Sequence, residues 1–139
     1  MLPVKSLNIK GHTYQCTLFP AKSGYLRGMK ISKICSALLT GQDAYSIMAV
    51  LETIIETDKD GSFVLDLFSS TLRDGTVINE TVFNDVYAGN YSEMFDALKF
   101  IVESNYGDVW DLIKKKMDSL DEKKEEAKTD EEIATSQVV

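Results

Sequence analysis

The sequence is poor in the residues that build metal sites, disulfide frameworks and imidazole-based catalytic centres. Its 139 residues include one histidine, His12, and two cysteines, Cys16 and Cys35. Two isolated cysteines in a cytosolic chain are usually small buried hydrophobic residues, because a reducing compartment disfavours a disulfide. One histidine is too few for a local Cys/His zinc site. We therefore expect no metal site and no cofactor.

Long apolar runs, a secretion signal and concentrated basic patches are also missing. No stretch is apolar enough to span a bilayer, and residues 1–11 lack the apolar core of a signal peptide. The formal charge is −7, and the only compact basic run, residues 114–116, is diluted by nearby aspartates. Nucleic acid attracts clustered Lys and Arg. We expect a cytosolic protein that uses neither a membrane nor nucleic acid as its main partner.

The motifs of common enzyme classes are absent. Neither the GxxxxGK[ST] phosphate loop nor GxGxxG occurs. Asp58-x-Asp60-Gly61 is similar to part of a calcium loop, but with Gly61 at the sixth position the twelfth falls on Leu67, where an EF-hand needs glutamate. We expect His12 to lie exposed in a hairpin turn, with no acid placed to orient its ring. The sequence therefore predicts a turn at residues 58–61 and no enzyme.

An N-terminal β-hairpin is the clearest pattern that is present. Residues 6–19 contain two runs in which apolar and polar residues alternate, joined by a turn at Lys10-Gly11-His12. Pro20 stops the second strand, because proline cannot donate a ladder hydrogen bond.

Helical spacing follows the hairpin. Apolar residues recur at three- and four-residue steps from Ser23, a plausible N-cap, to Thr40-Gly41. The apolar set of this first helix is Leu26, Met29, Ile31, Ile34, Leu38 and Leu39. Further helices are predicted over residues 42–57, 62–72 (where a strand is the less favoured alternative), 81–87, 92–104 and 108–120, with corners at Gly89 and Gly107.

The predicted fold class is α+β. An N-terminal β-hairpin packs on a compact, mainly helical body, and residues 1–120 form a single domain. Residues 121–139 are acidic and have few apolar residues, so they are predicted to form a disordered, flexible tail.

Aromatic residues gather in one stretch of the chain. Six of them fall within the 25 residues of 86–110. Core packing accounts for most of this surplus, and we expect Leu98, Ile101 and Val102 to be core. A minority of exposed aromatic residues is typical of a protein-binding surface. The residues predicted to contact a partner are Tyr87, Tyr91, Phe95, Tyr106 and Trp110.

Two short motifs in this stretch carry a family resemblance. Gly89-Asn90-Tyr91 precedes a helix-length segment, and Asn105-Tyr106-Gly107-Asp108 follows it. Together with the hairpin and the Pro20-Ala21-Lys22 helix start, this order resembles the tail assembly chaperones of long-tailed bacteriophages, over residues 5–112. The resemblance implies a non-enzymatic protein of the host cytoplasm. It implies binding to the tape measure protein, a long helical chain kept soluble by the chaperone, and assistance in recruiting the tail tube protein before the chaperone leaves the finished virion.

Two rival functions fit the same sequence. The chain could be a structural tail or connector (tail completion) component of the virion, or an acidic regulatory protein that blocks a host enzyme. A homo-oligomer is compatible with each of these functions. Whether the chain is present in the finished virion distinguishes the structural component from the chaperone.

Overall fold

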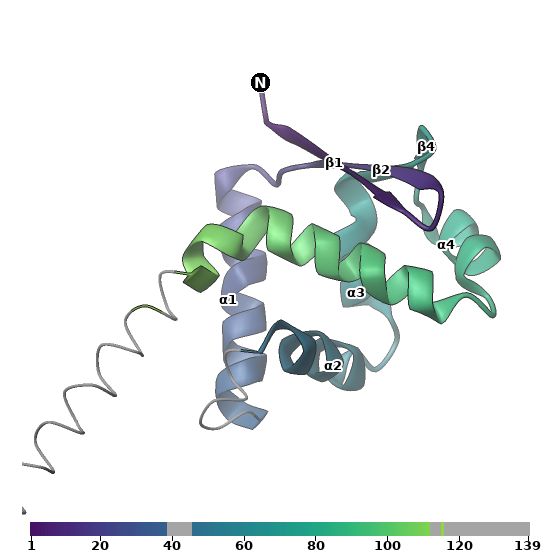
Figure 1. Cartoon of the computed structure of the whole chain (residues 1–139). Helices are drawn as coiled ribbons and strands as arrows, with labels where there is room; N and C mark the ends of the chain where they lie inside the picture. The colour runs from purple at the N-terminus through teal and green to yellow at the C-terminus, as the bar shows by residue number, and fades with distance from the viewer. Residues whose placement is uncertain (39–45, 112–114, 116–139) are drawn as a thin grey trace, which may run out of the picture. The chain divides into compact units, whose positions relative to one another are not determined.

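The computed structural model describes residues 1–38, 46–111 and 115 (Figure 1). By its internal contacts the chain divides into two units, Met1–Gly107 and Asp108–Val139. In the second unit the described residues, 108–111 and 115, are helical. The predicted domain boundary at residue 120 and the predicted tail lie outside the described residues. The sheet, the packing and the site described below belong to the first unit.

The predicted N-terminal hairpin is confirmed. Strand β1 (Val4–Ile9) pairs with β2 (His12–Thr17) in antiparallel register, from Val4 opposite Thr17 to Ile9 opposite His12. The turn residues Lys10 and Gly11 have φ of 51° and 85°, the left-handed values that a tight two-residue turn requires. The side-chain oxygen of Asn8 accepts a hydrogen bond from the Gly11 amide at 3.1 Å, which fixes this turn.

Two short strands extend the hairpin into a four-stranded sheet. Strand β3 (Thr71–Arg73) pairs with β2, and β4 (Thr76–Val77) pairs with β3, so the order is β1-β2-β3-β4. A helix over residues 62–72 is therefore correct only for α3 (Ser62–Leu67) and the 3-10 turn η2 (Phe68–Ser70). Residues 71–73 form a strand because they pair with the free edge of β2. This pairing is a tertiary interaction.

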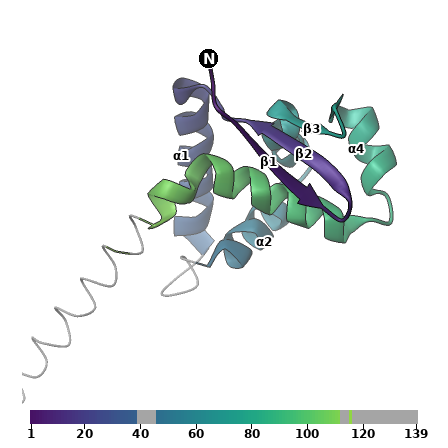
Figure 2. The ribbon, with the colours of Figure 1, turned by 45° about the horizontal axis from the view of Figure 1, so that its top comes forward.

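Within the described part of the first unit, four helices and the short α3 form the helical body on which the sheet packs (Figure 1). They are α1 (Ala21–Leu38), α2 (Ile47–Thr57), α4 (Glu80–Tyr87) and a long helix that begins at residue 91 and whose part in the first unit extends to residue 107. The long helix runs beneath the hairpin, with α2 on its other side (Figures 1 and 2). The α+β class predicted from the sequence, a hairpin on a mainly helical body, is confirmed.

Three predicted helix ends need correction. Helix α1 begins at Ala21, so Ser23 lies inside its first turn and donates to the Pro20 carbonyl at 3.2 Å instead of capping the helix. The long helix begins at residue 91, one residue before the predicted start, so Ser92 lies inside the helix and does not cap it. Ser46 caps α2, accepting from the Ala49 amide at 3.4 Å, whereas the predicted start at residue 42 lies outside the described residues.

The two predicted glycine corners have different outcomes. Gly89 has φ of 70° and separates α4 from the long helix, as predicted. Gly107 is helical, so the second corner is wrong. The Asn105 side chain explains this: its nitrogen donates to the Ile101 carbonyl at 3.0 Å and its oxygen accepts from the Phe19 amide at 2.9 Å. The asparagine therefore joins the helix to the chain after β2 and makes no turn.

The core lies between the sheet and the helices. Leu98, Ile101 and Val102 are at most 2% exposed, which confirms them as core residues. Both cysteines are buried and free, also as predicted. Across the residues that the structure describes, no helix combines the length and apolar character needed to cross a membrane.

Candidate functional site

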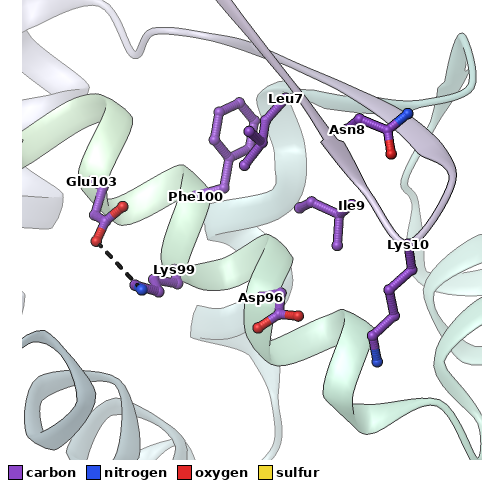
Figure 3. A pocket seen from close by; sticks show the side chains of 8 residues that line it. All are labelled: Leu7, Asn8, Ile9, Lys10, Asp96, Lys99, Phe100 and Glu103. Carbon is purple, nitrogen blue, oxygen red and sulfur yellow. Dashed lines mark ion pairs between the residues drawn. The ribbon is translucent and has the colours of Figure 1, made fainter.

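A groove between β1 and the long helix is the candidate binding site (Figure 3). Its volume is about 330 Å³. Leu7, Ile9 and Phe100 supply its apolar lining; Ile9 and Phe100 are at most 9% exposed, whereas Leu7 is 47% exposed. The apolar side chains of β1 and the helix approach each other because the hairpin lies along this helix. The groove therefore presents an accessible leucine over a buried apolar floor.

Charges of both signs border this floor. Lys10, Asp96, Lys99 and Glu103 line the groove with Asn8. The Lys99 Nζ lies 4.0 Å from Glu103 Oε1, one helical turn along (Figure 3). Lys10 donates to the Ser92 hydroxyl at 2.5 Å, which ties the hairpin turn to the start of the long helix. Exposed pairs contribute little stability, so these charges remain available to a partner.

Two residues predicted to contact a partner lie beside this groove. Tyr91 begins the long helix and is 67% exposed, and Phe95 is partly exposed one turn later. Phe95 is in turn four residues before Lys99 of the groove. Because residues four apart are neighbours on a helix surface, Tyr91 and Phe95 lead into the groove along one side of the helix.

The other three residues predicted to contact a partner, Tyr87, Tyr106 and Trp110, have different surroundings from one another. Tyr87 is 1% exposed, so it offers almost no surface to a partner in this structure. It packs against Phe68 and Phe83, with ring centroids 5.7 and 5.0 Å away. Tyr106 is half-buried and its hydroxyl donates to the Gly24 carbonyl at 2.7 Å. Trp110 belongs to the second unit.

A buried polar cluster, which the sequence did not reveal, holds the start of the long helix on the sheet. Glu93 is 2% exposed, and its Oε2 accepts hydrogen bonds from the Tyr14 hydroxyl at 2.5 Å and from Arg73 Nε at 2.8 Å. The Tyr14 proton is used in this bond, so the Tyr87 hydroxyl, 2.9 Å away, donates to the Tyr14 oxygen. No local sequence pattern predicts this cluster, because β2, β3, α4 and the long helix each supply one member.

The cluster shifts the pKa values of its members in opposite directions. Burial and the hydrogen bond to Glu93 raise the pKa of Tyr14 well above its ordinary value. Burial alone would raise the pKa of the Glu93 carboxyl, but hydrogen bonds from Arg73 and Tyr14 outweigh it, so this pKa lies below its ordinary value. Glu93 is therefore held charged and Tyr14 neutral, which suits a structural ion pair.

His12 does have an acidic partner, contrary to the sequence expectation. Its Nδ1 lies 2.6 Å from Asp74 Oδ2, and its Nε2 lies 3.9 Å from Glu93 Oε1. Asp74 also accepts from the Thr13 amide at 2.9 Å, because the turn between β3 and β4 packs against the hairpin turn. Within the described parts of the chain, no hydroxyl or thiol is hydrogen-bonded to the ring. The arrangement thus orients a histidine but supplies no nucleophile to it.

The calcium-like stretch is a helix cap. Asp58 accepts hydrogen bonds from the Phe63 and Val64 amides at 3.1 and 2.8 Å, and Asp60 accepts from the Ser62 amide at 3.0 Å. These carboxylates satisfy the first amides of α3, which confirms the predicted turn. Among the described residues, no group of three or more His, Cys, Asp or Glu side chains could hold a metal ion.

Comparison with protein families gives one match that covers most of the chain. The family described as "Phage tail assembly chaperone protein, TAC" matches residues 10–120. Searches of curated proteins and of solved structures gave no significant match. The matched region contains β2, all the described helices of the first unit, and the helical side of the groove. Chaperones of this kind act while phage tails are assembled in the host cell, and their partners are tail proteins. The chain belongs to the phage tail assembly chaperone family.

Proposed function

We propose that this chain is a non-enzymatic chaperone that binds the tape measure protein and keeps it soluble. The observation that carries the proposal is the groove between β1 and the long helix, in a chain of the tail assembly chaperone family. An elongated helical protein with apolar stripes aggregates unless those stripes are covered. A groove with an apolar floor and charged borders covers such a stripe by helix-in-groove binding.

The dimensions of the groove support a few anchoring side chains. Its volume of about 330 Å³ is near the lower end of ligand-binding cavities. Two or three apolar side chains on one face of a partner helix would contact Leu7, Ile9 and Phe100. Charged residues of the partner would meet Asp96 and Lys99 at the border, and they would set its orientation more than its affinity.

Tyr91 and Phe95 extend this proposed surface beyond the groove. Aromatic side chains are enriched among residues that dominate binding energy, because each brings a large area with few rotatable bonds. Tyr87 and Tyr106 stabilise the fold and are left out of the proposed contact. A role for Trp110 in binding stays a prediction. The formal charge of −7 would help to keep the complex soluble through mutual repulsion.

Coexpression with the tape measure protein of the same phage tests the proposal. We expect the tape measure protein to move from the insoluble to the soluble fraction and to copurify with the chaperone. Leu7→Glu places a charge over the apolar floor and should reduce copurification at least about tenfold, since about 1.4 kcal/mol of binding energy corresponds to this factor. The matched control is Val77→Glu, an exposed apolar strand residue at the opposite edge of the sheet.

Three outcomes separate the possibilities. A tape measure protein that stays insoluble with the unaltered chain contradicts the proposed function. Equal loss of copurification in Leu7→Glu and Val77→Glu moves the contact away from the groove. Mass spectrometry of purified virions tests the structural alternative: a stoichiometric amount of this chain in the virion favours a tail or connector component. We expect none.

A further inference from the structure

The outer face of α1 carries large apolar side chains that the fold does not use. Tyr25, Leu26 and Met29 are 63%, 52% and 53% exposed, although Leu26 and Met29 were predicted to be on the buried side. The buried side of α1 includes Ile31, which belongs to the predicted apolar set, and Cys35. Helix α1 lies at one side of the group of helices in the first unit (Figures 1 and 2).

This face has the opposite charge to the rest of the protein. Helix α1 contains Lys22, Arg27, Lys30 and Lys33 and no acidic residue, whereas the whole chain has a formal charge of −7. Arg27 is paired with Asp66 at 2.7 Å, and the Lys30 ammonium lies 4.3 Å from the centre of the Phe63 ring. Within the described residues, Lys22 and Lys33 form no ion pair. Two exposed cations are therefore left on an acidic protein.

The spacing of these residues forms a stripe along the helix. Lys22, Leu26, Met29 and Lys33 follow each other at steps of four, three and four residues, the spacing of one helix face. The two lysines are eleven residues apart, which is about 16 Å at 1.5 Å per residue. Tyr25 widens the apolar centre, three residues after Lys22. The stripe, which we call the α1 face, thus has an apolar centre and a cation at each end.

We propose that the α1 face docks an amphipathic helix of a partner protein whose apolar stripe is flanked by Asp or Glu residues. The apolar centre would bury the partner's stripe, and Lys22 and Lys33 would pair with carboxylates about three turns apart. This contact is separate from the groove and does not depend on the tape measure proposal. An anionic membrane is the less favoured occupant, because the net negative charge opposes it and three apolar residues anchor a membrane weakly.

Synthetic peptides test the proposal on the full chain. One fluorescent helical peptide of about 18 residues carries a leucine stripe with glutamates about eleven residues apart, matched to the α1 face. A second peptide has lysine in place of each glutamate. By fluorescence anisotropy at low salt, we expect the glutamate peptide to bind at least about tenfold more tightly than the lysine peptide. The difference should shrink as salt rises to about 0.3 M, because exposed charges are screened.

Substitutions locate the contact. Leu26→Ser combined with Met29→Ser, and separately Lys33→Glu, should each weaken binding of the glutamate peptide at least about fivefold. Lys5→Glu is the matched charge control, since Lys5 is an exposed lysine on β1, and it should change the affinity less than about twofold. All the substituted side chains are exposed, so circular dichroism and the melting temperature should stay unchanged.

Several results would overturn the proposal. Equal affinity for the two peptides removes the charge argument, and an equal effect of Lys33→Glu and Lys5→Glu removes the location. Binding to phosphatidylserine vesicles that Leu26→Ser with Met29→Ser abolishes, without peptide binding, assigns the face to a membrane. A dimer in sedimentation experiments that the same double substitution dissociates assigns it to a second copy of this chain. Leu7→Glu should leave peptide binding intact, so failure of the groove proposal does not affect this test.

Discussion

The contact between Gly28 and Tyr106 leads to a prediction for Gly28→Ala. The sign of the change in the free energy of unfolding depends on two opposing energies. Gly28 lies on the inner side of α1, and a Cβ atom added there would be 3.1 Å from Tyr106 Cε1. In an exposed helix interior, replacing glycine by alanine stabilises a protein by up to about 1 kcal/mol, because the helical backbone then loses less entropy on folding. At Gly28 the added methyl group must also displace the tyrosine ring.

The ring of Tyr106 is held at its far end. Its hydroxyl donates to the Gly24 carbonyl at 2.7 Å, one helical turn before Gly28. Moving the ring away therefore lengthens a hydrogen bond with a net value of about 1 kcal/mol. Forcing an extra carbon into a packed contact costs about 1 to 3 kcal/mol. The costs exceed the helix-propensity gain, so we expect Gly28→Ala to lower the free energy of unfolding by about 1 to 2 kcal/mol.

Urea denaturation followed by circular dichroism measures this change, as a lower midpoint at an unchanged slope. Gly107→Ala is the matched control: Gly107 is also helical, but a Cβ there would have no atom within 4 Å. This control should be stabilised by about 0.5 to 1 kcal/mol. In a Tyr106→Phe background the ring is no longer tethered, and Gly28→Ala should cost about 1 kcal/mol less than in the unaltered chain. If Gly28→Ala stabilises the chain as much as Gly107→Ala does, the contact is not close and the reasoning is refuted.

Two further predictions concern the buried polar cluster. Glu93→Gln leaves the Arg73 guanidinium with a neutral partner, and it should lower the free energy of unfolding, measured by urea denaturation, by about 2 kcal/mol. This loss is smaller than for a fully buried pair, because Arg73 is 19% exposed. An unchanged midpoint would exclude a structural ion pair. Stability should also depend on pH at both ends of the range. The folded pKa of Glu93 is lowered, so its contribution is present above its ordinary pKa of about 4.3 and is lost as the pH falls through the folded value. The pKa of Tyr14 is raised, so its contribution is present below about pH 10 and is lost as the pH rises further. Melting temperatures across pH 3 to about 11 should fall at both ends, and Tyr14→Phe should flatten the alkaline fall; an identical alkaline fall in this variant would contradict the assignment.

Local sequence signals were sufficient for the elements that form by local interactions. The hairpin was predicted because alternation and the Lys10-Gly11 turn lie within fourteen residues, 6–19. Strands β3 and β4 were missed because three and two residues are too few to show alternation. Their signal was the Asp74-Gly75 turn, whose two residues have φ of 50° and 79°. A dipeptide of this type between short apolar runs favours a hairpin over a helix end.

The candidate site was predicted less well than the fold, because the exposure of an aromatic residue depends on the whole fold. Tyr91 and Tyr87 both adjoin the glycine corner at Gly89, yet one is 67% exposed and the other 1%. Tyr87 is buried because Tyr14 and Glu93, from β2 and the long helix, complete a polar cluster around its hydroxyl. No spacing within residues 86–110 contains that information.

In helix α1 the predicted apolar set combined residues from two sides of the helix: Ile31 is buried, whereas Leu26 and Met29 are exposed. Large apolar residues occur on both sides of this helix, so a three- and four-residue spacing fits either side. The glycines decide between them. Gly24 and Gly28 are four residues apart, and both approach other side chains closely, with a Cβ at Gly24 lying 3.2 Å from Phe19 Cβ. A helix side without side chains allows such approach, so the glycine side packs inward and Leu26 and Met29 are turned to the solvent. The packing of Gly28 against Tyr106, which makes Gly28→Ala costly, thus also places the α1 face on the outside. Relieving the contact between Gly28 and Tyr106 should change the stability of the fold without changing the affinity of the α1 face for an acidic helix.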